Sequence, residues 1–295
     1  MTARSTGSEG RALLIAQLTD IHVGFAPDQQ PEELNLTRFR AVLKRLFDGP
    51  NVPDLLVLSG DITDHGDAGS FARTAQLLEH CPCPILPLVG NHDSRGGLLG
   101  AFPQVKPAEG GFLHYVIEVA GLRIICLDTL EDGRHGGAFC EARAGWLAER
   151  LAEAPDTPTL IFMHHPPVVA GIDWMDPAPD EPWIIRLRDV LRGQTQVQAI
   201  HCGHLHRQIT TSFAGIPLGV TPSVAPLVAM DLRPIDQDAP DGRALITTEP
   251  PTYALHRWDG TSLVSHYERV GQWQVLARFD DGLQPMIRAM FGERD

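Results

Sequence analysis

The sequence lacks any apolar stretch near the ~20 residues that a membrane-spanning helix requires. Its first ten residues are polar and lack the apolar centre of a signal peptide, so we expect residues 1–10 to be a disordered leader of a cytoplasmic protein without a membrane partner. Cysteine is scarce, odd in number and without metal-type spacing. The five cysteines are Cys81, Cys83, Cys126, Cys140 and Cys202. We therefore expect reduced, mostly buried thiols rather than a disulfide framework.

Positive charge is also scarce. The chain has 24 Lys and Arg residues against 37 Asp and Glu residues, and its formal net charge is −13. Proteins that bind nucleic-acid polymers draw much of their affinity from basic patches, so this balance argues against such a partner. A small anionic substrate is compatible with the charge, provided that bound metal reverses the sign of the local potential.

The sequence does contain a series of short apolar runs, each followed closely by polar residues. The runs are Ala12–Leu18, Asp54–Leu58, Ile85–Val89, Thr159–Met163 and Val197–Ile200. Runs of this kind indicate buried parallel strands that deliver side chains at their carboxyl ends. Helical patterns alternate with them at residues 34–47, 68–80, 141–154 and 183–191. The alternation predicts a layered α/β fold with a mainly parallel sheet.

Three antiparallel pairs of strands are predicted beside these runs. They lie at 112–119 with 122–127, at 208–214 with 216–220, and at 253–258 with 262–269. Two long loops, 168–182 and 222–251, are rich in Pro and acidic residues, and the tail after Gly271 is weakly patterned.

The polar residues at the strand ends supply the ligands for two metal ions. Two cations ~3.5–4 Å apart can clamp the attacking and the leaving oxygens of a phosphoryl displacement. We expect one metal to be held by Asp20, His22, Asp61 and His206, and the other by Asp61, Asn91, His164 and His204. Two divalent ions, two aspartates and a bridging hydroxide leave a local charge of about +1, which suits a phosphate oxygen. The metals would also lower the pKa of bound water toward ~7 and so make hydroxide available.

The order and spacing of these residues resemble the signature of the calcineurin-like metallophosphoesterases. The matching blocks are Asp20-Ile21-His22, Gly60-Asp61-x-x-Asp64, Gly90-Asn91-His92-Asp93, His164 and Gly203-His204-Leu205-His206. The Asn-His-Asp form of the third block and the His-His-Pro-Pro run are most similar to bacterial class III cyclic nucleotide phosphodiesterases and the related glycerophosphodiesterases. The resemblance implies a four-layer αββα sandwich at 11–220. It also implies a C-terminal loop, hairpin and tail at 221–295 that pack on or cap this domain.

The resemblance further implies a dinuclear Fe/Mn or Zn centre, in which Co or Mn can substitute, and a homodimer or higher homo-oligomer. It implies that His92 contacts the substrate phosphate or the leaving oxygen, and it places Asp61 and Asn91 with His92 in the catalytic set. A departing alkoxide needs a proton or a positive charge, which gives His92 a physical role.

Three further residues near the blocks, Asp64, Asp93 and His165, are candidates for orienting the ligands or touching the substrate. Asp64 could equally serve as a helix cap or turn residue, and His165 is expected to pack or to form a hydrogen bond. His135 could line the substrate pocket, although solvated loop histidines are commoner. Trp174 could cover the substrate, contact a second subunit or anchor its own loop.

The leading hypothesis is hydrolysis of small phosphodiesters, such as 3′,5′-cyclic nucleotides or glycerophosphodiesters, by metal-bound hydroxide. The alternative is a phosphomonoesterase or a nucleotide pyrophosphatase on the same scaffold. A non-catalytic binding scaffold is disfavoured, because such a scaffold has no need of all seven metal-binding positions.

Overall fold

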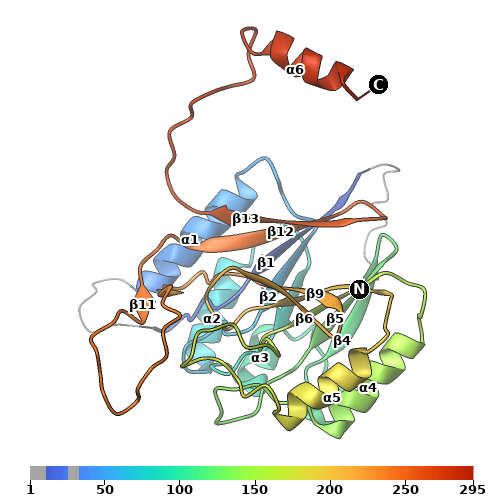
Figure 1. Cartoon of the computed structure of the whole chain (residues 1–295), viewed down its shortest axis with the longest axis vertical. Coiled ribbons are helices and arrows are strands. Elements are labelled where there is room, and N and C mark those ends of the chain that lie inside the picture. The colour runs from blue at the N-terminus through green and yellow to red at the C-terminus, as the bar shows by residue number, and fades with distance from the viewer. Residues whose placement is uncertain (1–10, 26–32, 295) are drawn as a thin grey trace.

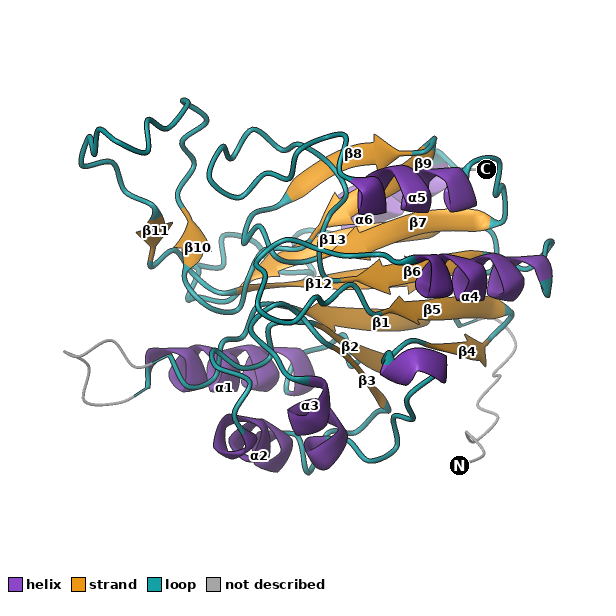
Figure 2. Ribbon diagram, turned by 90° about the horizontal axis from the view of Figure 1, so that it is seen from below, coloured by secondary structure: helices purple, strands orange, loops and turns teal. Residues whose placement is uncertain are grey.

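Two β-sheets lie face to face at the centre of the molecule, with helices on the outer face of each (Figures 1 and 2). The structure is a computed structural model that describes residues 11–25 and 33–294, so the expected leader at 1–10 lies outside the described residues. The first sheet has the strand order β13-β12-β1-β2-β3 and the second has the order β4-β5-β6-β7-β9-β8. Pairing is parallel through β1, β2 and β3 and through β5, β6, β7 and β9. It is antiparallel where β12 joins β1 and β13, and at the edge strands β4 and β8.

The strands follow the apolar runs of the sequence. In the first sheet they are β1 (Leu13–Leu18), β2 (Leu55–Ser59), β3 (Ile85–Leu88), β12 (Thr252–Trp258) and β13 (Leu263–Arg269). In the second they are β4 (Tyr115–Val119), β5 (Leu122–Leu127), β6 (Thr159–Met163), β7 (Val197–Cys202), β8 (Ile209–Phe213) and β9 (Ile216–Val220). A third, two-stranded sheet joins β10 (Leu227–Val228) to β11 (Ile246–Thr247) inside the expected loop 222–251.

The helices cover the two outer faces of the sandwich. Those beside the first sheet are α1 (Leu34–Phe47), α2 (Ala68–Leu77) and α3 (Arg95–Ala101), and those beside the second are α4 (Glu141–Ala152) and α5 (Pro182–Leu191). A 3-10 turn spans Glu109–Gly111. The Asp67 side chain caps α2 by accepting from the backbone N–H of Ser70, and Pro182 occupies the first turn of α5, where a missing N–H has no cost. Helix α2 ends earlier than the predicted residue 80, ahead of the prolines at 82 and 84.

Three buried apolar clusters fill the three interfaces between the four layers. Along β2, Leu56 and Leu58 belong to the cluster under α1 and α2, whereas Leu55 and Val57 belong to the cluster between the two sheets. The third cluster joins the second sheet to α4 and α5. Because successive side chains of a strand point to opposite faces, burial on both faces explains why the strands read as continuous apolar runs. The predicted αββα sandwich is confirmed.

The C-terminal hairpin is built into the first sheet. Strand β12 pairs antiparallel with β1, with Ile15 opposite His256, and β13 forms the sheet edge. Beyond it, α6 (Gln284–Gly292) lies away from the body of the molecule and has no buried residue (Figure 1). The sequence did not predict α6, and it also did not predict α3, whose Gly-rich sequence is a poor helix former. No helix in the described part of the chain combines the length and apolarity needed to cross a membrane.

Candidate metal centre

The carboxyl ends of five strands, three from the first sheet and two from the second, meet at one point. The turn after β1 carries Asp20 and His22, the turn after β2 carries Asp61 and Asp64, and the turn after β3 carries Asn91, His92 and Asp93. From the second sheet, β6 is followed by His164 and His165, and β7 by His204 and His206. The backbone N–H of His204 donates to both carboxylate oxygens of Asp20, at 3.0 and 2.9 Å, so the two sheets are joined at this point.

The backbone of these turns is strained. Seven non-glycine residues of the described chain have positive φ, and five of them are candidate ligands: Asp20 at 51°, His22 at 50°, Asp61 at 48°, His204 at 71° and His206 at 51°. A left-handed conformation is unfavourable for residues with a Cβ and persists only where the surrounding structure fixes it. These sharp turns let neighbouring side chains of one turn point to the same centre.

The first group of donors consists of Asp20, His22, Asp61 and His206. Nε2 of His22 lies 3.2 Å from Nε2 of His206 and 3.6 Å from Oδ2 of Asp61, while Nε2 of His206 lies 3.3 Å from Oδ1 of Asp20. Nδ1 of His206 donates to the carbonyl of Pro226 at 2.8 Å, and Nδ1 of His22 donates to Oδ1 of Asp64 at 3.1 Å.

These hydrogen bonds fix the tautomers of both rings. A carbonyl or carboxylate oxygen only accepts, so each Nδ1 carries the hydrogen and each neutral Nε2 presents a lone pair. At 3.2 Å the two Nε2 atoms require a positive charge between them, either a proton, which Asp20 favours by raising the pKa of His206 against the effect of burial, or a metal ion in its place. His22 and His206 therefore fit a cation, and the carbonyl and carboxylate behind them orient the rings as the outer partners of metal ligands do.

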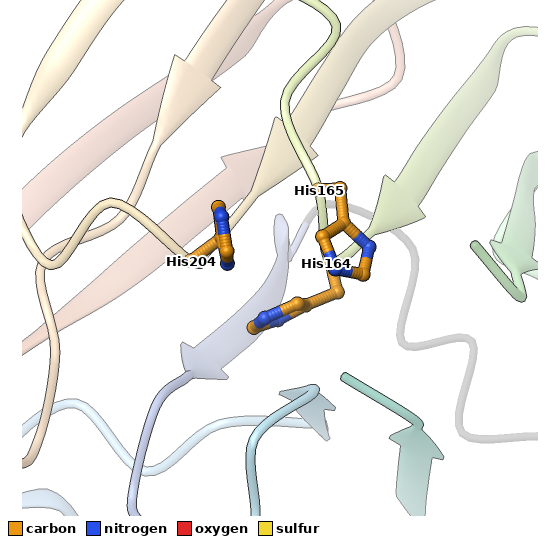
Figure 3. Close-up of side chains that lie close together, drawn as sticks. All are labelled: His164, His165 and His204. Carbon is orange, nitrogen blue, oxygen red and sulfur yellow. The ribbon is translucent and has the colours of Figure 1, made fainter. Parts of the chain in front are cut away.

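The second group of donors lies on the other side of Asp61. Nε2 of His164 is 3.3 Å from Oδ2 of Asp61, and Nδ1 of His164 donates to the carbonyl of Ser59 at 2.9 Å. Figure 3 shows His164 and His165 at the end of β6 beside His204 at the end of β7, and their donor atoms lie within 4.8 Å of one another. Among the described residues, the buried Nε2 of His164 and Oδ1 of Asn91 have no hydrogen-bond partner. Buried polar atoms are seldom left unpaired, so these too fit a metal ion.

His165 forms a packing contact on one side of its ring and faces the site on the other. Its Nδ1 lies 2.8 Å from Oγ1 of Thr129, which is the hydrogen bond expected from the sequence. Its Nε2 is buried without a partner in the described chain and belongs to the same cluster as His164 and His204. His165 therefore adds an imidazole beside the second group of donors.

The two remaining carboxylates support the turns. Asp64 holds Nδ1 of His22, as described above. Asp93 accepts from the backbone N–H groups of Gly90, Ile62 and Thr63 at 3.0, 3.1 and 2.9 Å, and from the Thr63 hydroxyl at 2.9 Å. Both carboxylate oxygens of Asp93 thus accept hydrogen bonds from the turns after β2 and β3. Asp93 therefore supports these two turns.

His92 is held at the edge of the site by two hydrogen bonds. Its backbone N–H donates to Oδ1 of Asp61 at 2.8 Å, and its Nδ1 donates to the carbonyl of Asp64 at 2.9 Å. Its ring lies edge-on to that of His22, with centroids 4.6 Å apart. With Nδ1 engaged, only Nε2 is free to act on a ligand.

The buried charges of the site depend on one another. Burial alone would raise the pKa of Asp61, but His164 and His22 hold it well below the ordinary value, and His206 likewise lowers the pKa of Asp20 to about 2. Burial would lower the pKa of His164, yet Asp61 raises it to about 9. The two carboxylates therefore stay ionised and favour positive charge between the sheets. Burial lowers the pKa of His204 to about 3, so its ring is neutral and available as a ligand.

A pocket of about 580 Å³ opens over these residues. His22, Asp61, Asn91, His92, His204 and His206 form part of its wall. Another part comes from the loops that follow β5 and β6 and from α5, and includes Arg134, His135, Trp174, Glu181 and Trp183. Strands β10 and β11 contribute Val228 and Ile246. His135 is an exposed loop residue that also lines this pocket, and its Nδ1 lies 3.4 Å from Nδ2 of Asn91. The motifs gave no signal for Arg134, Glu181 or Trp183, because these residues lie outside the motifs, Arg134 in a loop and the other two at the start of α5.

The sandwich and its cluster of aspartates and histidines fit a metal-dependent hydrolase of the αββα type. Residues 13–208 match the family model described as calcineurin-like phosphoesterase, and the chain belongs to this family, whose members use a dinuclear metal centre. The family resemblance predicted from the sequence is confirmed.

Relatives in this family carry the names of phosphodiesterases. The chain is 35% identical over 224 residues to a probable glycerophosphodiester phosphodiesterase of Arcobacter nitrofigilis, with 75% of this chain and 80% of that protein covered. It is 33% identical over 223 residues to a probable cyclic nucleotide phosphodiesterase of Rhodopseudomonas palustris, with 72% and 77% covered. Purple acid phosphatase PPD1 from yellow lupin seeds shares the fold, with a TM-score of 0.61, 15% identity, and coverage of 90% of this chain and 53% of that chain.

Proposed function

We propose that this protein is a metal-dependent phosphodiesterase that hydrolyses small phosphodiesters, either 3′,5′-cyclic nucleotides or glycerophosphodiesters. The observation that carries the proposal is the convergence of Nε2 of His22 and Nε2 of His206, 3.2 Å apart, on the buried carboxylates of Asp61 and Asp20, 3.6 and 3.3 Å away. The two relatives are named as phosphodiesterases, and this supports a diester as the substrate.

The donor set divides into two ligand groups that share Asp61. Asp20, His22, Asp61 and His206 would hold one metal, and Asp61, Asn91, His164 and His204 would hold the other. Imidazole, carboxylate and amide donors suit Fe, Mn or Zn, and Co or Mn can substitute. When bound, the metals would supply Lewis acidity, which neutralises charge on the phosphoryl oxygens and makes water nucleophilic at neutral pH.

The protein's own residues orient the substrate and move a proton. Because Nδ1 of His92 is bonded to the carbonyl of Asp64, a protonated His92 would present the hydrogen on Nε2 to the pocket. The departing alcohol oxygen of a diester needs this proton, so His92 is proposed as the acid that protonates the leaving group. The hydrogen bond from the His92 N–H to Asp61 fixes the distance of the ring from the donor set.

The positive side chains near the motifs favour a singly charged substrate. Arg95 is bound by both oxygens of Asp128, at 2.7 and 2.9 Å, and Arg207 lies 2.9 Å from Glu249, so both cations are compensated. Arg134 lines the pocket, but its guanidinium lies 3.0 Å from Glu131 and 3.8 Å from Glu181. The pocket thus adds little net positive charge to the metals, which suits a diester better than a dianionic monoester.

The proposal also covers the domain organisation of the protein, its cellular compartment and its oligomeric state. Residues 11–220 would form the catalytic domain and 221–295 a C-terminal loop, hairpin and tail, and the pairing of β12 with β1 supports packing of the hairpin on this domain, whereas α6 lies away from it. The five free thiols support a reducing compartment, the cytoplasm. The exposed apolar residues of α6, Met286, Met290 and Phe291, support a homodimer or higher homo-oligomer.

A substrate panel tests the proposed function. With two metals loaded, the protein should hydrolyse a bis-aryl phosphate with a higher kcat/KM than an aryl monophosphate, and should act on cyclic AMP or glycerophosphocholine. The reverse ranking of the two aryl substrates would favour a monoesterase. Turnover of none of the four would favour a binding scaffold.

A further inference from the structure

Two cysteines lie close together at a point remote from the metal centre. Cys81 and Cys83 flank Pro82 in the turn between α2 and β3, and their sulfur atoms are 3.7 Å apart. Both side chains are half-buried. The turn leads into the amino end of β3, whereas the metal-binding residues follow the carboxyl end of that strand.

The turn holds the two thiols near each other. The backbone N–H of Cys81 donates to the carbonyl of Leu78 at 2.9 Å, and the carbonyl of Pro84 accepts from the N–H of Leu56 at 3.0 Å. Residues on both sides of the pair are therefore anchored, and the prolines at 82 and 84 restrict the backbone further. A bond between the two sulfurs requires them to approach to about 2.05 Å, a movement that side-chain rotation can supply in part.

The two thiols differ in acidity. A hydrogen bond with Cys83 lowers the pKa of Cys81 to about 7, while the same interaction raises the pKa of the Cys83 thiol. Cys81 is thus partly ionised at neutral pH and reacts as a nucleophile, whereas Cys83 keeps its hydrogen.

We propose that Cys81 and Cys83 form a redox-active dithiol, a modification site at which a peroxide produces an intramolecular disulfide. In the first step the Cys81 thiolate attacks a peroxide oxygen. The O–O bond breaks, Cys81 becomes a sulfenic acid, and with hydrogen peroxide the leaving hydroxide takes up a proton to form water. In the second step the Cys83 sulfur attacks the sulfenic sulfur, the S–O bond breaks, and the Cys83 hydrogen leaves with the hydroxyl as water.

The product should be easy to reduce. The disulfide would close a ring across a single intervening residue, Pro82, and such a short connection strains the bond. Strained disulfides have more oxidising potentials and belong to the labile class, so a small thiol should restore the pair.

Cys140 provides a matched control within the same chain. It is also half-buried. Burial raises the pKa of its thiol, but hydrogen bonds with Arg143 outweigh this effect and lower the pKa overall. In the described part of the chain no second thiol contacts Cys140, so a peroxide can take it to a sulfenic acid but not to an internal disulfide.

The experiment uses the full chain and hydrogen peroxide as the probe. After mild oxidation, alkylation and proteolysis, mass spectrometry should find the peptide with Cys81 and Cys83 lighter by two hydrogen atoms and unalkylated, and dithiothreitol should restore alkylation. Peptides with both thiols still alkylated, at a peroxide dose that oxidises Cys140, would overturn the proposal. This measurement on the wild-type protein depends neither on the folding of a variant nor on phosphodiesterase activity.

Single substitutions separate the roles of the two cysteines. In Cys83→Ser, Cys81 should accumulate as a sulfenic acid that dimedone traps, whereas in Cys81→Ser the remaining Cys83 should stay a thiol. Cys140→Ser should form the disulfide to the same extent as the wild type. Equal dimedone labelling in the first two variants would overturn the assignment of Cys81 as the attacking thiol.

Discussion

Nε2 of His164 lies 3.3 Å from Oδ2 of Asp61, the same oxygen that faces His22 from the other side at 3.6 Å. One carboxylate oxygen thus stands between two imidazoles from different sheets. The rings of His164 and His22 are each fixed from behind by an oxygen that accepts from Nδ1. This arrangement makes Asp61 the residue on which both proposed ligand groups depend.

The first prediction concerns the substitution Asp61→Ala. The variant should lose both metals, because the shared carboxylate serves each ion and its removal leaves two cations to repel each other. Metal content measured by elemental analysis after dialysis checks this result. A variant that keeps about two metals per chain and near-normal turnover would show that Asp61 does not bridge. Asp93→Asn, a change in the carboxylate that supports the turns, should retain more metal than Asp61→Ala.

The second prediction separates catalysis from metal binding at His92. His92→Ala should keep two metals per chain and lose ~10²–10⁴-fold in kcat on a substrate with an alcohol leaving group, the usual contribution of positioned acid–base catalysis. The loss should be much smaller with nitrophenolate, which leaves without a proton. Steady-state kinetics on both substrates decides. An equal loss on both would indicate electrostatic stabilisation of the phosphoryl group instead, and lost metal would make His92 a ligand.

The third prediction concerns the wall of the pocket. Trp174 lines the pocket with 43% of its surface exposed, so its ring is available to a flat nucleobase. Stacking of a base on an aromatic ring contributes about 1–3 kcal/mol, so Trp174→Ala should raise KM for cyclic AMP roughly tenfold. The KM for glycerophosphoethanolamine, which has no ring, should change little. Trp273→Ala, a change in an exposed tryptophan outside the pocket, is the control, and equal KM changes on both substrates in Trp174→Ala would contradict stacking.

The fourth prediction is a pH dependence of stability that originates at His201. This residue is buried between the sheets, its ring stacks on that of His256 at 3.9 Å, and neither ring nitrogen has a partner in the described chain. Burial lowers the pKa of His201 from 6.5 to about 4. The unfolded state therefore binds more protons between these values, and the free energy of unfolding falls as the pH is lowered through this range.

Between pH 7 and pH 5 the contribution of His201 to this loss is about 2 kcal/mol. Replacement by Phe, an aromatic ring that cannot take a proton, should remove most of that part of the slope. Urea unfolding at pH 7 and at pH 5 measures the change in the free energy of unfolding. The exposed His80 offers a control, since His80→Phe should leave the slope unchanged, and a slope in His201→Phe equal to that of the wild type would contradict this account.

The sequence predicted most of the sandwich because buried parallel strands and amphipathic helices carry strong local signals. Helix α1 and strands β5, β6 and β9 lie at the predicted residues. It could not predict that β12 pairs with β1, since nothing local distinguishes a hairpin that caps a domain from one that extends a sheet. Helix α6 was missed although Met286, Ile287, Met290 and Phe291 recur at helical spacing, because its nine residues make only about two and a half turns.

The candidate site, like the fold, could be predicted from the sequence only in part. The motif residues could be found because each follows a strand directly, and parallel strands in layered sheets bring their carboxyl ends together. The outer partners, such as the Pro226 and Ser59 carbonyls, are backbone atoms and leave no trace in residue type. Arg134 reaches the pocket from a loop, and Glu181 and Trp183 from the start of α5, and the positions of both segments over the site depend on tertiary packing.

A metal titration of the chelator-treated protein tests the central claim most directly. Bis-aryl phosphate turnover should be absent from the metal-free protein and should rise as Mn²⁺ or Zn²⁺ is added, and full activity should coincide with two bound metals per chain. Asp61→Ala, carried through the same titration, should retain neither metal and should gain no activity. Full turnover by protein shown to be free of metal would contradict the claim that this chain is a dinuclear phosphodiesterase.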